Sequence, residues 1–347
     1  LGDVYKRQAD SSHHPTDDRP IHNRPNHKRE ELDTTMRIVS FGYQTWGRRT
    51  LQALLDSPHE VVLAVTHPAS DDSYKGIWSD SVEELARENN IPVHLTERAD
   101  PETIELVQRA APDVIVVNSW YTWMPKELYD FPRHGTLNLH DSLLPKFTGF
   151  SPVLWALISG ADEIGLTVHR MDEQLDTGDI LVQHSLPIEP GITGTELVLA
   201  GMELIPGAVN EALAALESGN PQWRPQDKSA RTYFHKRSER DGLIDWRSDA
   251  ADIERLIRAL SAPYPPAFTH YRGERIEVLA SRVSEARYGG TAGRVIVQEN
   301  GGTVVCGPDA LRGNNFGLVI TRVRTPDGVE HDGAAFFRRG GYLTDAP

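Results

Sequence analysis

Residues 113–118 read DVIVVN and residues 135–140 read GTLNLH, and both are short apolar runs of the kind that forms buried strands. Two similar runs precede them, RIVSF at 37–41 and EVVLAVT at 60–66, and segments with helix signals lie between the runs. Strands that alternate with helices predict an α/β fold with a doubly wound, mostly parallel sheet, because each crossover helix returns the chain to the same end of the sheet.

Helix starts are marked by particular residue types. Ser81, with Glu84 three residues later, has the pattern of a capping box. Asp100-Pro101 places proline at the first helical position, where its missing N–H costs nothing. A long helix is expected from about Thr195, with a kink at Pro206. The pattern also predicts helices over 47–56 and 152–160 and strands over 163–170 and 179–185.

The character of the sequence changes at residues 217–240, which are polar and basic and which we interpret as a linker. We expect residues 36–216 to form a first domain and residues 241–347 a second one. The second begins with an amphipathic helix over 248–260, capped by Ser248. Short strands and turn signals follow, and they predict a small antiparallel barrel. The strands are expected over 267–271, 274–280, 294–298, 304–306 and 317–324, with turns at Arg272-Gly273, Asn300-Gly301 and Asp327-Gly328.

Composition excludes several classes of protein. The 347 residues are 39% hydrophobic and 25% charged, an ordinary globular composition that suffices for two cores. No apolar run approaches the roughly 20 residues that cross a bilayer, so we expect no membrane-spanning segment. The single cysteine, Cys306, excludes an internal disulfide and a cysteine-type zinc site, and it fits a cytoplasmic location. The formal charge of −14 disfavours general nucleic-acid binding.

Residues 1–35 are polar and rich in histidine and proline, without apolar periodicity. They lack the apolar stretch of a secretory signal and are too acidic for a transit peptide. Met36 stands directly before the first predicted strand, as a start codon would. We therefore expect residues 1–35 to be disordered and not native, and we expect no metal site among their histidines.

Asn138 and His140 lie two residues apart on the strand predicted over 135–140, so their side chains project from one face near its carboxyl end. Ligands bind at this end of open α/β sheets. An amide donor beside an imidazole can hold an oxyanion and move a proton. A strand whose polar end simply meets water explains the same pattern without chemistry.

Residues 171–179 (MDEQLDTGD) crowd carboxylates into a loop between two predicted strands. One of them could orient His140 and favour its charged form. Because Asp and Gly dominate ordinary turns, a solvated acidic turn is the simpler interpretation of this stretch taken alone.

Considered together, Asn138-x-His140, residues 142–145 (SLLP) and residues 176–179 (DTGD) resemble the 10-formyltetrahydrofolate-dependent formyltransferases. This family includes methionyl-tRNA, sugar-nucleotide and glycinamide-ribotide formyltransferases. Residues 231–246 and 263–268 resemble the family's linker and the start of its C-terminal domain, so the resemblance covers nearly everything from Met36 onward. It implies a Rossmann-like catalytic domain followed by an OB-like barrel, with 10-formyltetrahydrofolate as co-substrate and no metal.

The resemblance also implies the site residues. Asn138 and His140 would steady the oxyanion that forms at the formyl group, and Asp176 would hold His140 and accept the proton of the attacking amine. Trp120 could flank the flat pterin ring. The residues expected beside the folate are Tyr121, Thr122, Trp123, Ser142, Leu143, Leu144, Pro145 and Asp172.

The sequence departs from the tRNA enzymes of the family at residues 67–80 (HPASDDSYKGIWSD), where those enzymes carry a basic insertion. An acidic loop counts against tRNA, since phosphate contacts dominate nucleic-acid affinity. Phe150 stands where the sugar-nucleotide enzymes carry Arg. Residues 41–48 and 77–80 resemble the siderophore branch, which formylates N5-hydroxyornithine, and an acidic pocket suits a cationic substrate. We therefore expect a small amine or hydroxylamine as acceptor, with methionyl-tRNA as the alternative and a sugar nucleotide as a further one.

Other classes fit less well. A dinucleotide-dependent oxidoreductase lacks its G-x-G-x-x-G motif, since Gly42 and Gly47 stand alone. A Ser/His/Asp hydrolase could use Ser142, but G-x-S-x-G is absent. A hydrolase of formyl-folate and a non-catalytic binding module stay open, because water can replace the amine and spacing does not prove turnover.

Overall fold

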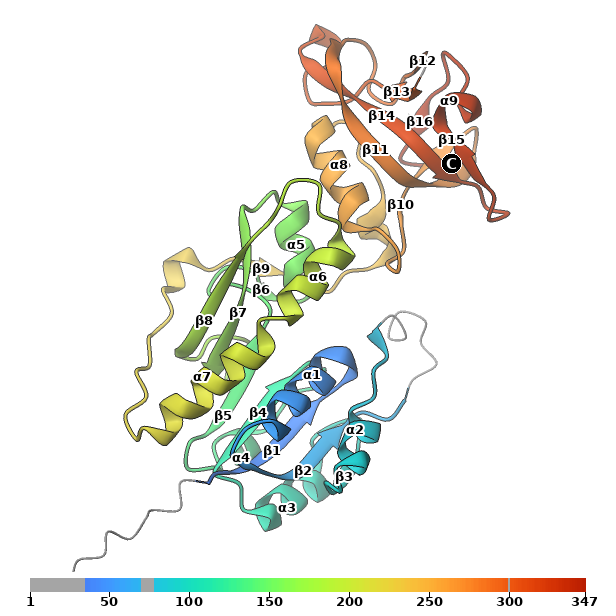
Figure 1. The fold of residues 1–347 in the computed structure, drawn as a ribbon. Helices are drawn as coiled ribbons and strands as arrows, with labels where there is room; N and C mark the ends of the chain where they lie inside the picture. Colours follow the sequence, from blue (N-terminus) through green and yellow to red (C-terminus); the bar gives the residue numbers. More distant parts are fainter. Residues whose placement is uncertain (1–34, 70–77, 299) are drawn as a thin grey trace, which may run out of the picture. The chain divides into compact units, whose positions relative to one another are not determined.

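A computed structural model of the chain describes residues 35–69, 78–298 and 300–347 (Figure 1). The expectations for residues 1–34, and for the acidic part of the loop at 70–77, lie outside the described residues.

The first half of the described chain builds a seven-stranded sheet in the order β3-β2-β1-β4-β5-β7-β8. Its first five strands pair in parallel, whereas β7 is antiparallel to both β5 and β8. This confirms the mostly parallel α/β sheet that the alternation of strands and helices predicts. The strands are β1 (Arg37–Gly42), β2 (Glu60–Thr66), β3 (Val93–Leu95), β4 (Val114–Asn118), β5 (Thr136–His140), β7 (Glu163–Arg170) and β8 (Ile180–Pro187).

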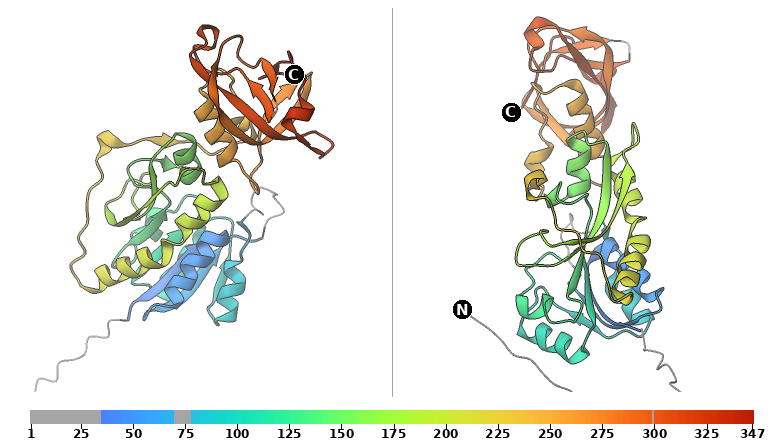
Figure 2. Two further views of the ribbon diagram at one scale, coloured as in Figure 1. Left: turned by 45° about the horizontal axis from the view of Figure 1, so that its top comes forward. Right: turned by 90° about the vertical axis from the view of Figure 1, so that its left-hand side faces the viewer.

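Helices cover the two faces of this sheet unequally. One core joins α1, α2, α6 and α7 to one face, and a smaller core joins α3 and α4 to β1, β2 and β4 on the other face (Figure 2). The second face of β5 and β7 is therefore left to loops, which is where an open site can form. The helices are α1 (Gln44–Leu55), α2 (Val82–Glu88), α3 (Pro101–Ala110), α4 (Lys126–Tyr129), α5 (Pro152–Ile158), α6 (Gly194–Met202) and α7 (Ile205–Glu217).

The helix boundaries differ from the sequence prediction in two places. Helix α1 begins at Gln44, three residues before the predicted start. The long helix expected from Thr195 is two helices, and Pro206 lies in the first turn of α7, where no N–H partner is needed. Taken as one helix, Gly194–Glu217 is long and apolar enough to cross a membrane, contrary to our expectation that no such stretch exists. Half of its apolar window is buried, and α7 packs against α1, β7 and β8 as a core helix does.

The C-terminal part is an antiparallel sheet in the order β12-β13-β14-β11-β10-β16, with β15 paired to β14. A bridge between Arg294 and Tyr342, beside the two outermost strands, nearly closes the sheet into the predicted barrel. The elements are α8 (Ala250–Ala259), β10 (Ala267–Tyr271), β11 (Glu274–Tyr288), β12 (Val295–Gln298), β13 (Gly301–Val304), β14 (Asn315–Arg324), β15 (Glu330–Asp332), α9 (Gly333–Phe336) and β16 (Leu343–Thr344), with a 3₁₀ helix η4 (Ala310–Arg312).

In this part the predicted strand over 267–271 coincides with β10, whereas β11 continues past the predicted end at residue 280 to Tyr288. The predicted cap of α8 and the bounds of one further strand are wrong, and the first predicted turn is accurate. The N-cap of α8 is Asp249 rather than Ser248. The strand expected over 304–306 is β13, which lies three residues earlier because it pairs with both β12 and β14. Arg272 and Gly273 form the expected two-residue turn between β10 and β11, with φ values of 57° and 85° that suit a hairpin.

The segment at residues 217–240 contacts the first domain at the start of β8 and at the loop after β5. Arg224 forms a bridge with Ile180 at the start of β8. Further on, β9 (Tyr233–Phe234) pairs in parallel with β6 (Thr148–Gly149), inside the loop that follows β5. Two 3₁₀ helices, η2 (Lys228–Ala230) and η3 (Glu239–Gly242), complete it.

Candidate active site

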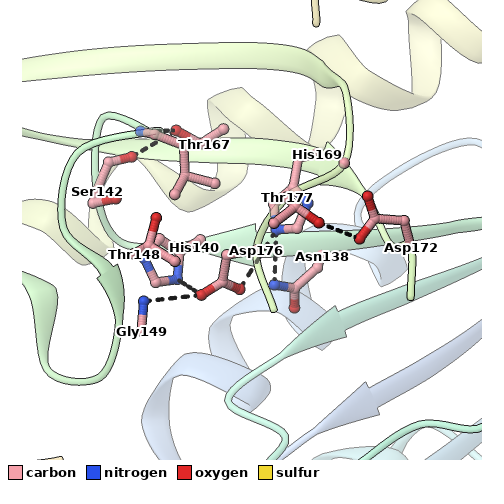
Figure 3. A network of polar contacts seen from close by, with 12 residues as sticks. Asn138, His140, Ser142, Thr148, Gly149, Thr167, His169, Asp172, Asp176 and Thr177 are labelled. Atoms are coloured by element: carbon pink, nitrogen blue, oxygen red, sulfur yellow. Dashed lines mark hydrogen bonds and ion pairs between the residues drawn. The ribbon is translucent and has the colours of Figure 1, made fainter. Parts of the chain in front are cut away.

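Strand β5 presents Asn138 and His140 on the face that the helices leave uncovered, while Leu137 and Leu139 point into the core on the other face. Strand β7 runs antiparallel beside it, and its register places His169 opposite Asn138 and Thr167 opposite His140. The alternation of side chains along two neighbouring strands thus gathers polar groups on one patch of the sheet (Figure 3).

The loop between β7 and β8 brings Asp176 onto this patch (Figure 3). Its Oδ2 atom lies 3.7 Å from His140 Nδ1, and its Oδ1 atom lies 3.8 Å from His169 Nε2. The backbone N–H of Gly149 donates to Oδ2 at 3.1 Å. The Asp176 side chain is only 6% exposed. The structure therefore brings together the three side chains that the sequence marks as catalytic, from two separate segments.

His169 is a fourth member of the group, and the sequence prediction missed it. Burial lowers the pKa of this imidazole, so the ring is neutral near pH 7. Its Nδ1 atom lies 2.9 Å from the carbonyl of Arg170, which places the single proton on Nδ1 and leaves Nε2 as an acceptor. Asn138 Nδ2 donates to Nε2 at 3.1 Å. His169 thus fixes the orientation of the Asn138 amide and leaves its second N–H for a ligand.

His140 has one of its two nitrogens already engaged. Its Nε2 atom donates to the carbonyl of Phe147 at 3.0 Å. In the neutral ring this leaves a lone pair on Nδ1, the nitrogen that faces Asp176. A second proton on Nδ1 would lie beside the Asp176 carboxylate. His140 can therefore accept and return a proton at Nδ1.

The aromatic residues after β4 are divided between the core and the surface. Trp120 packs between Phe41, at a centroid distance of 5.1 Å, and His67, at 4.0 Å. Tyr121 and Trp123 are 49% and 64% exposed, and the Tyr121 hydroxyl donates to Gln44. Thr122 is exposed between them. Flat, exposed rings at the carboxyl end of a strand suit a pterin, and their folate role stays a prediction.

The other residues predicted beside the folate mainly shape the loops. Ser142 and Leu144 are buried, and Thr167 ties them together by donating to the Ser142 carbonyl and accepting the Leu144 N–H. Leu143 packs against Gly165 of β7. The Pro145 carbonyl accepts hydrogen bonds from its own loop and from the linker.

Asp172 shapes the loop that carries Asp176, because its carboxylate accepts the Gln174 N–H at 3.0 Å and the Thr177 hydroxyl. A direct contact between these loop residues and a folate stays a prediction.

Asp141 is a further acidic group at the site and follows His140 directly. Burial raises the pKa of its carboxyl to about 6, and the indole of Trp46 donates to it. Trp46 in turn packs edge-on against Trp78, at a centroid distance of 5.6 Å. Within residues 35–69, 78–298 and 300–347, no lysine or arginine lies within 4.0 Å of the Asp141 carboxylate. The part of the chain that the structure describes also contains no group of three or more His, Cys, Asp or Glu residues arranged to hold a metal ion.

The fold defines a class of two-domain proteins in which an α/β sheet, here with a polar patch on its uncovered face, is followed by a barrel domain. Residues 36–209 match the formyl transferase family, and residues 236–340 match the family's C-terminal domain. The chain belongs to the formyl transferase family, and it is a formyltransferase.

Its relatives share both domains. The chain is 36% identical over 296 residues to a methionyl-tRNA formyltransferase of Pseudomonas entomophila, covering 84% of this chain and 92% of the relative. A methionyl-tRNA formyltransferase of Desulfotalea psychrophila is 35% identical over 272 residues, covering 77% of this chain and 83% of the relative.

A solved structure of an N-formyltransferase from Helicobacter canadensis, in complex with folinic acid and dTDP-3-aminofucose, shares the fold. Its TM-score is 0.58 at 17% identity, over 82% of this chain and 98% of that one.

Proposed function

We propose that this chain transfers the formyl group of 10-formyltetrahydrofolate to an amine or hydroxylamine nitrogen. The observation that carries the proposal is the meeting of Asn138, His140 and Asp176 on one uncovered patch of the sheet. Family membership supports the reaction class, and the exposed rings of Tyr121 and Trp123 fit a flat pterin.

The geometry assigns a task to each side chain. The acceptor nitrogen forms a bond to the formyl carbon, and the bond from that carbon to the folate nitrogen breaks. Asn138 has one N–H directed to His169, and its second N–H meets the formyl oxygen as negative charge develops there. One such donor is worth about 3 kcal/mol of barrier. His140 Nδ1 takes the proton from the acceptor nitrogen and passes it to the departing folate nitrogen, while Asp176 stabilises the charged ring.

This assignment differs in one respect from what the family resemblance implies. Because His140 Nε2 is held by the Phe147 carbonyl, the available nitrogen faces Asp176. His140 then moves the proton and Asp176 supports it, whereas the resemblance gives proton acceptance to Asp176.

For the acceptor, the relatives support the amino group of methionyl-tRNA, which is our alternative rather than our first expectation from sequence. The similarity extends through the barrel domain in relatives of that name. Charge is compatible with tRNA only on this part of the chain: residues 236–347 carry 16 basic and 15 acidic residues. Residues 36–235 carry 14 basic and 28 acidic residues, a net charge of −14, which repels phosphate. We therefore propose methionyl-tRNA as the acceptor and expect the barrel to receive it.

A small cationic hydroxylamine of the N5-hydroxyornithine class is the second candidate. Asp141 favours it, because its partly buried carboxylate accepts from a neutral indole and has no lysine or arginine within 4.0 Å among the described residues, so that His140 is the positive group that acts on it. A cationic substrate would add positive charge there and relieve the cost of desolvating the carboxylate.

The two acceptors can be separated by one assay. Release of tetrahydrofolate would be followed with charged initiator tRNA, N5-hydroxyornithine, ornithine and an aminosugar nucleotide, at 50 and 200 mM salt. Preferential turnover of tRNA, falling steeply with salt, supports the first candidate. Salt-insensitive turnover of hydroxyornithine supports the second. Formate release without any amine would make the chain a hydrolase, and silence with every acceptor would overturn the proposed transfer.

A further inference from the structure

Gln226, in the segment between the two family matches, holds the backbone of the turn that carries Asp176. Its side-chain Nε2 donates two hydrogen bonds, to the Asp176 carbonyl at 2.9 Å and to the Gly178 carbonyl at 2.8 Å. Asp176 has a φ of 54°, in the left-handed region, which residues other than glycine rarely adopt. The Gln226 amide therefore stabilises a backbone conformation that Asp176 would not adopt without support.

Gln226 is itself fixed to the sheet. Two residues earlier, Arg224 exchanges two backbone hydrogen bonds of 2.8 Å with Ile180 of β8. The Arg224 guanidinium also donates to the Gln183 side chain at 2.9 Å. Gln226 thus reaches the turn from a segment that is tied to β8.

Thr232, immediately before β9, holds the loop that follows β5. Its hydroxyl accepts the Phe147 N–H at 2.8 Å, and its carbonyl accepts the Thr148 N–H at 2.9 Å. Its own N–H donates to the Pro145 carbonyl at 3.3 Å. Three hydrogen bonds therefore join this one linker residue to the loop.

That loop supplies a backbone contact to each member of the proton-transfer pair. The Phe147 carbonyl accepts from His140 at 3.0 Å, and the Gly149 N–H donates to Asp176 at 3.1 Å. A Cβ atom on Gly149 would lie 2.4 Å from the Phe234 carbonyl oxygen, so loop and linker are in close contact. The linker thus supports the pair from the loop side as well as from the turn.

We propose that Gln226 and Thr232 are positioning residues for formyl transfer, so that the linker supports catalysis as well as joining two domains. The rate measurements below rest on the proposed function. Gln226 fixes the turn from which the Asp176 carboxylate projects, and Thr232 fixes the loop that binds both partners. The separation of His140 Nδ1 and Asp176 Oδ2 is already 3.7 Å, so a looser turn would carry the carboxylate further from the nitrogen that takes the proton.

Other charges near this pair stay constant in the test. The titratable groups that face it are His169 on β7, Asp141 at the end of β5 and Asp172 in the same loop as Asp176. None of these residues is altered below, so a change in rate reports on the positioning of His140 and Asp176.

The first test compares Gln226→Met with Gln222→Met. The first substitution keeps the length of the side chain and removes both donors. Gln222 is the matched control, because its amide donates only to the Asn220 carbonyl nearby in the linker. For Gln226→Met we expect kcat to fall about 10–100-fold, as misplacement of a reacting group by about 1 Å does, with KM for formyl-folate changed less than about twofold. Gln222→Met should keep the wild-type kcat.

The second test uses Thr232. Thr232→Val keeps the shape and removes the acceptor of the Phe147 N–H, whereas Thr232→Ser keeps that acceptor. We expect kcat to fall about 10-fold in the valine variant, equivalent to one lost hydrogen bond, and to stay within about twofold in the serine variant. Equal rates in both variants would contradict the role of Thr232.

A third measurement needs no acceptor. Backbone amide hydrogen exchange of residues 176–179 can be followed by NMR in the wild type and in Gln226→Met, and we expect faster exchange in the variant because the turn loses two hydrogen bonds. If the wild type transfers no formyl group to any acceptor, the proposed function fails, and this exchange measurement still decides the inference. A folded Gln226→Met variant with wild-type kcat and wild-type exchange would overturn it. If that variant does not fold, the Thr232 pair decides.

Discussion

The substitution His169→Phe tests whether His169 orients the Asn138 amide, the proposed oxyanion donor. Phenylalanine is similar in size to histidine and suits a site where the ring is 2% exposed. It removes the Nε2 acceptor that now receives the Asn138 N–H at 3.1 Å. The Asn138 amide then has no fixed orientation and a buried donor without a partner.

The size of the effect follows from these two losses. An unsatisfied buried donor costs about 1–3 kcal/mol of stability. Loss of one oxyanion donor lowers kcat about 10²–10³-fold. The loss is smaller if the Asn138 amide keeps its correct orientation for part of the time. We therefore expect kcat to fall by between about 10-fold and 10³-fold, while the KM of each substrate changes little.

Single-turnover formyl transfer at saturating substrate measures the effect, with thermal unfolding as a check on folding. His184→Phe is the matched control, because His184 lies on β8 and pairs with Glu211 away from the site. A folded His169→Phe variant whose kcat stays within twofold of the wild type would refute the reasoning that His169 orients Asn138.

Three further predictions follow from single residues. His140→Ala and Asp176→Ala should each lose at least about 10²-fold in kcat while circular dichroism shows a folded chain, and near-normal turnover in either variant would remove that residue from the mechanism. Because the pKa of Asp141 is raised to about 6, the folded chain binds the proton of this carboxyl more tightly than the unfolded chain does. The contribution of protonated Asp141 to the free energy of unfolding is therefore full below about pH 4 and is lost as pH rises through 6. The free energy of unfolding of Asp141→Asn, measured by denaturant titration, should therefore rise relative to that of the wild type by up to about 2–3 kcal/mol between pH 4 and pH 7.5. A difference between the two proteins that stays constant with pH would contradict the raised pKa. Cys306 is buried and the pKa of its thiol is raised to about 12, so a thiol reagent at pH 8 should label it only in the unfolded chain, and rapid labelling of the native protein would contradict the burial.

Local patterns predict most of the first sheet, because its central strands are mostly buried and three of its helices, α2, α3 and α6, carry side-chain caps. The predicted strands at 60–66 and 163–170 coincide with β2 and β7, and Asp100 caps α3 as expected. The boundary of β13 is wrong because tertiary pairing with β12 and β14, rather than local sequence, sets it. The division of the long helix at Pro206 is likewise a matter of packing, since a kink and a break look alike in sequence.

Only the parts of the site that lie on one strand or within one sequence motif can be predicted from the sequence. Asn138 and His140 follow from alternation within β5, and the pairing with Asp176 needs the family resemblance. The role of His169 depends on the antiparallel register of β7 against β5, although the alternation of Thr167 and His169 with buried neighbours was a usable signal. The contacts of Gln226 and Thr232 join segments more than 45 residues apart and leave no mark in composition, so the linker is only a polar stretch in the sequence.

A crystal structure of the chain with a stable formylated folate bound tests the central claim most directly. We expect the formyl oxygen within about 3.2 Å of Asn138 Nδ2, on the side of the amide away from His169, and the formyl carbon facing His140 Nδ1. A formyl group bound away from this patch, with Asn138, His140 and Asp176 directed elsewhere, would contradict the account.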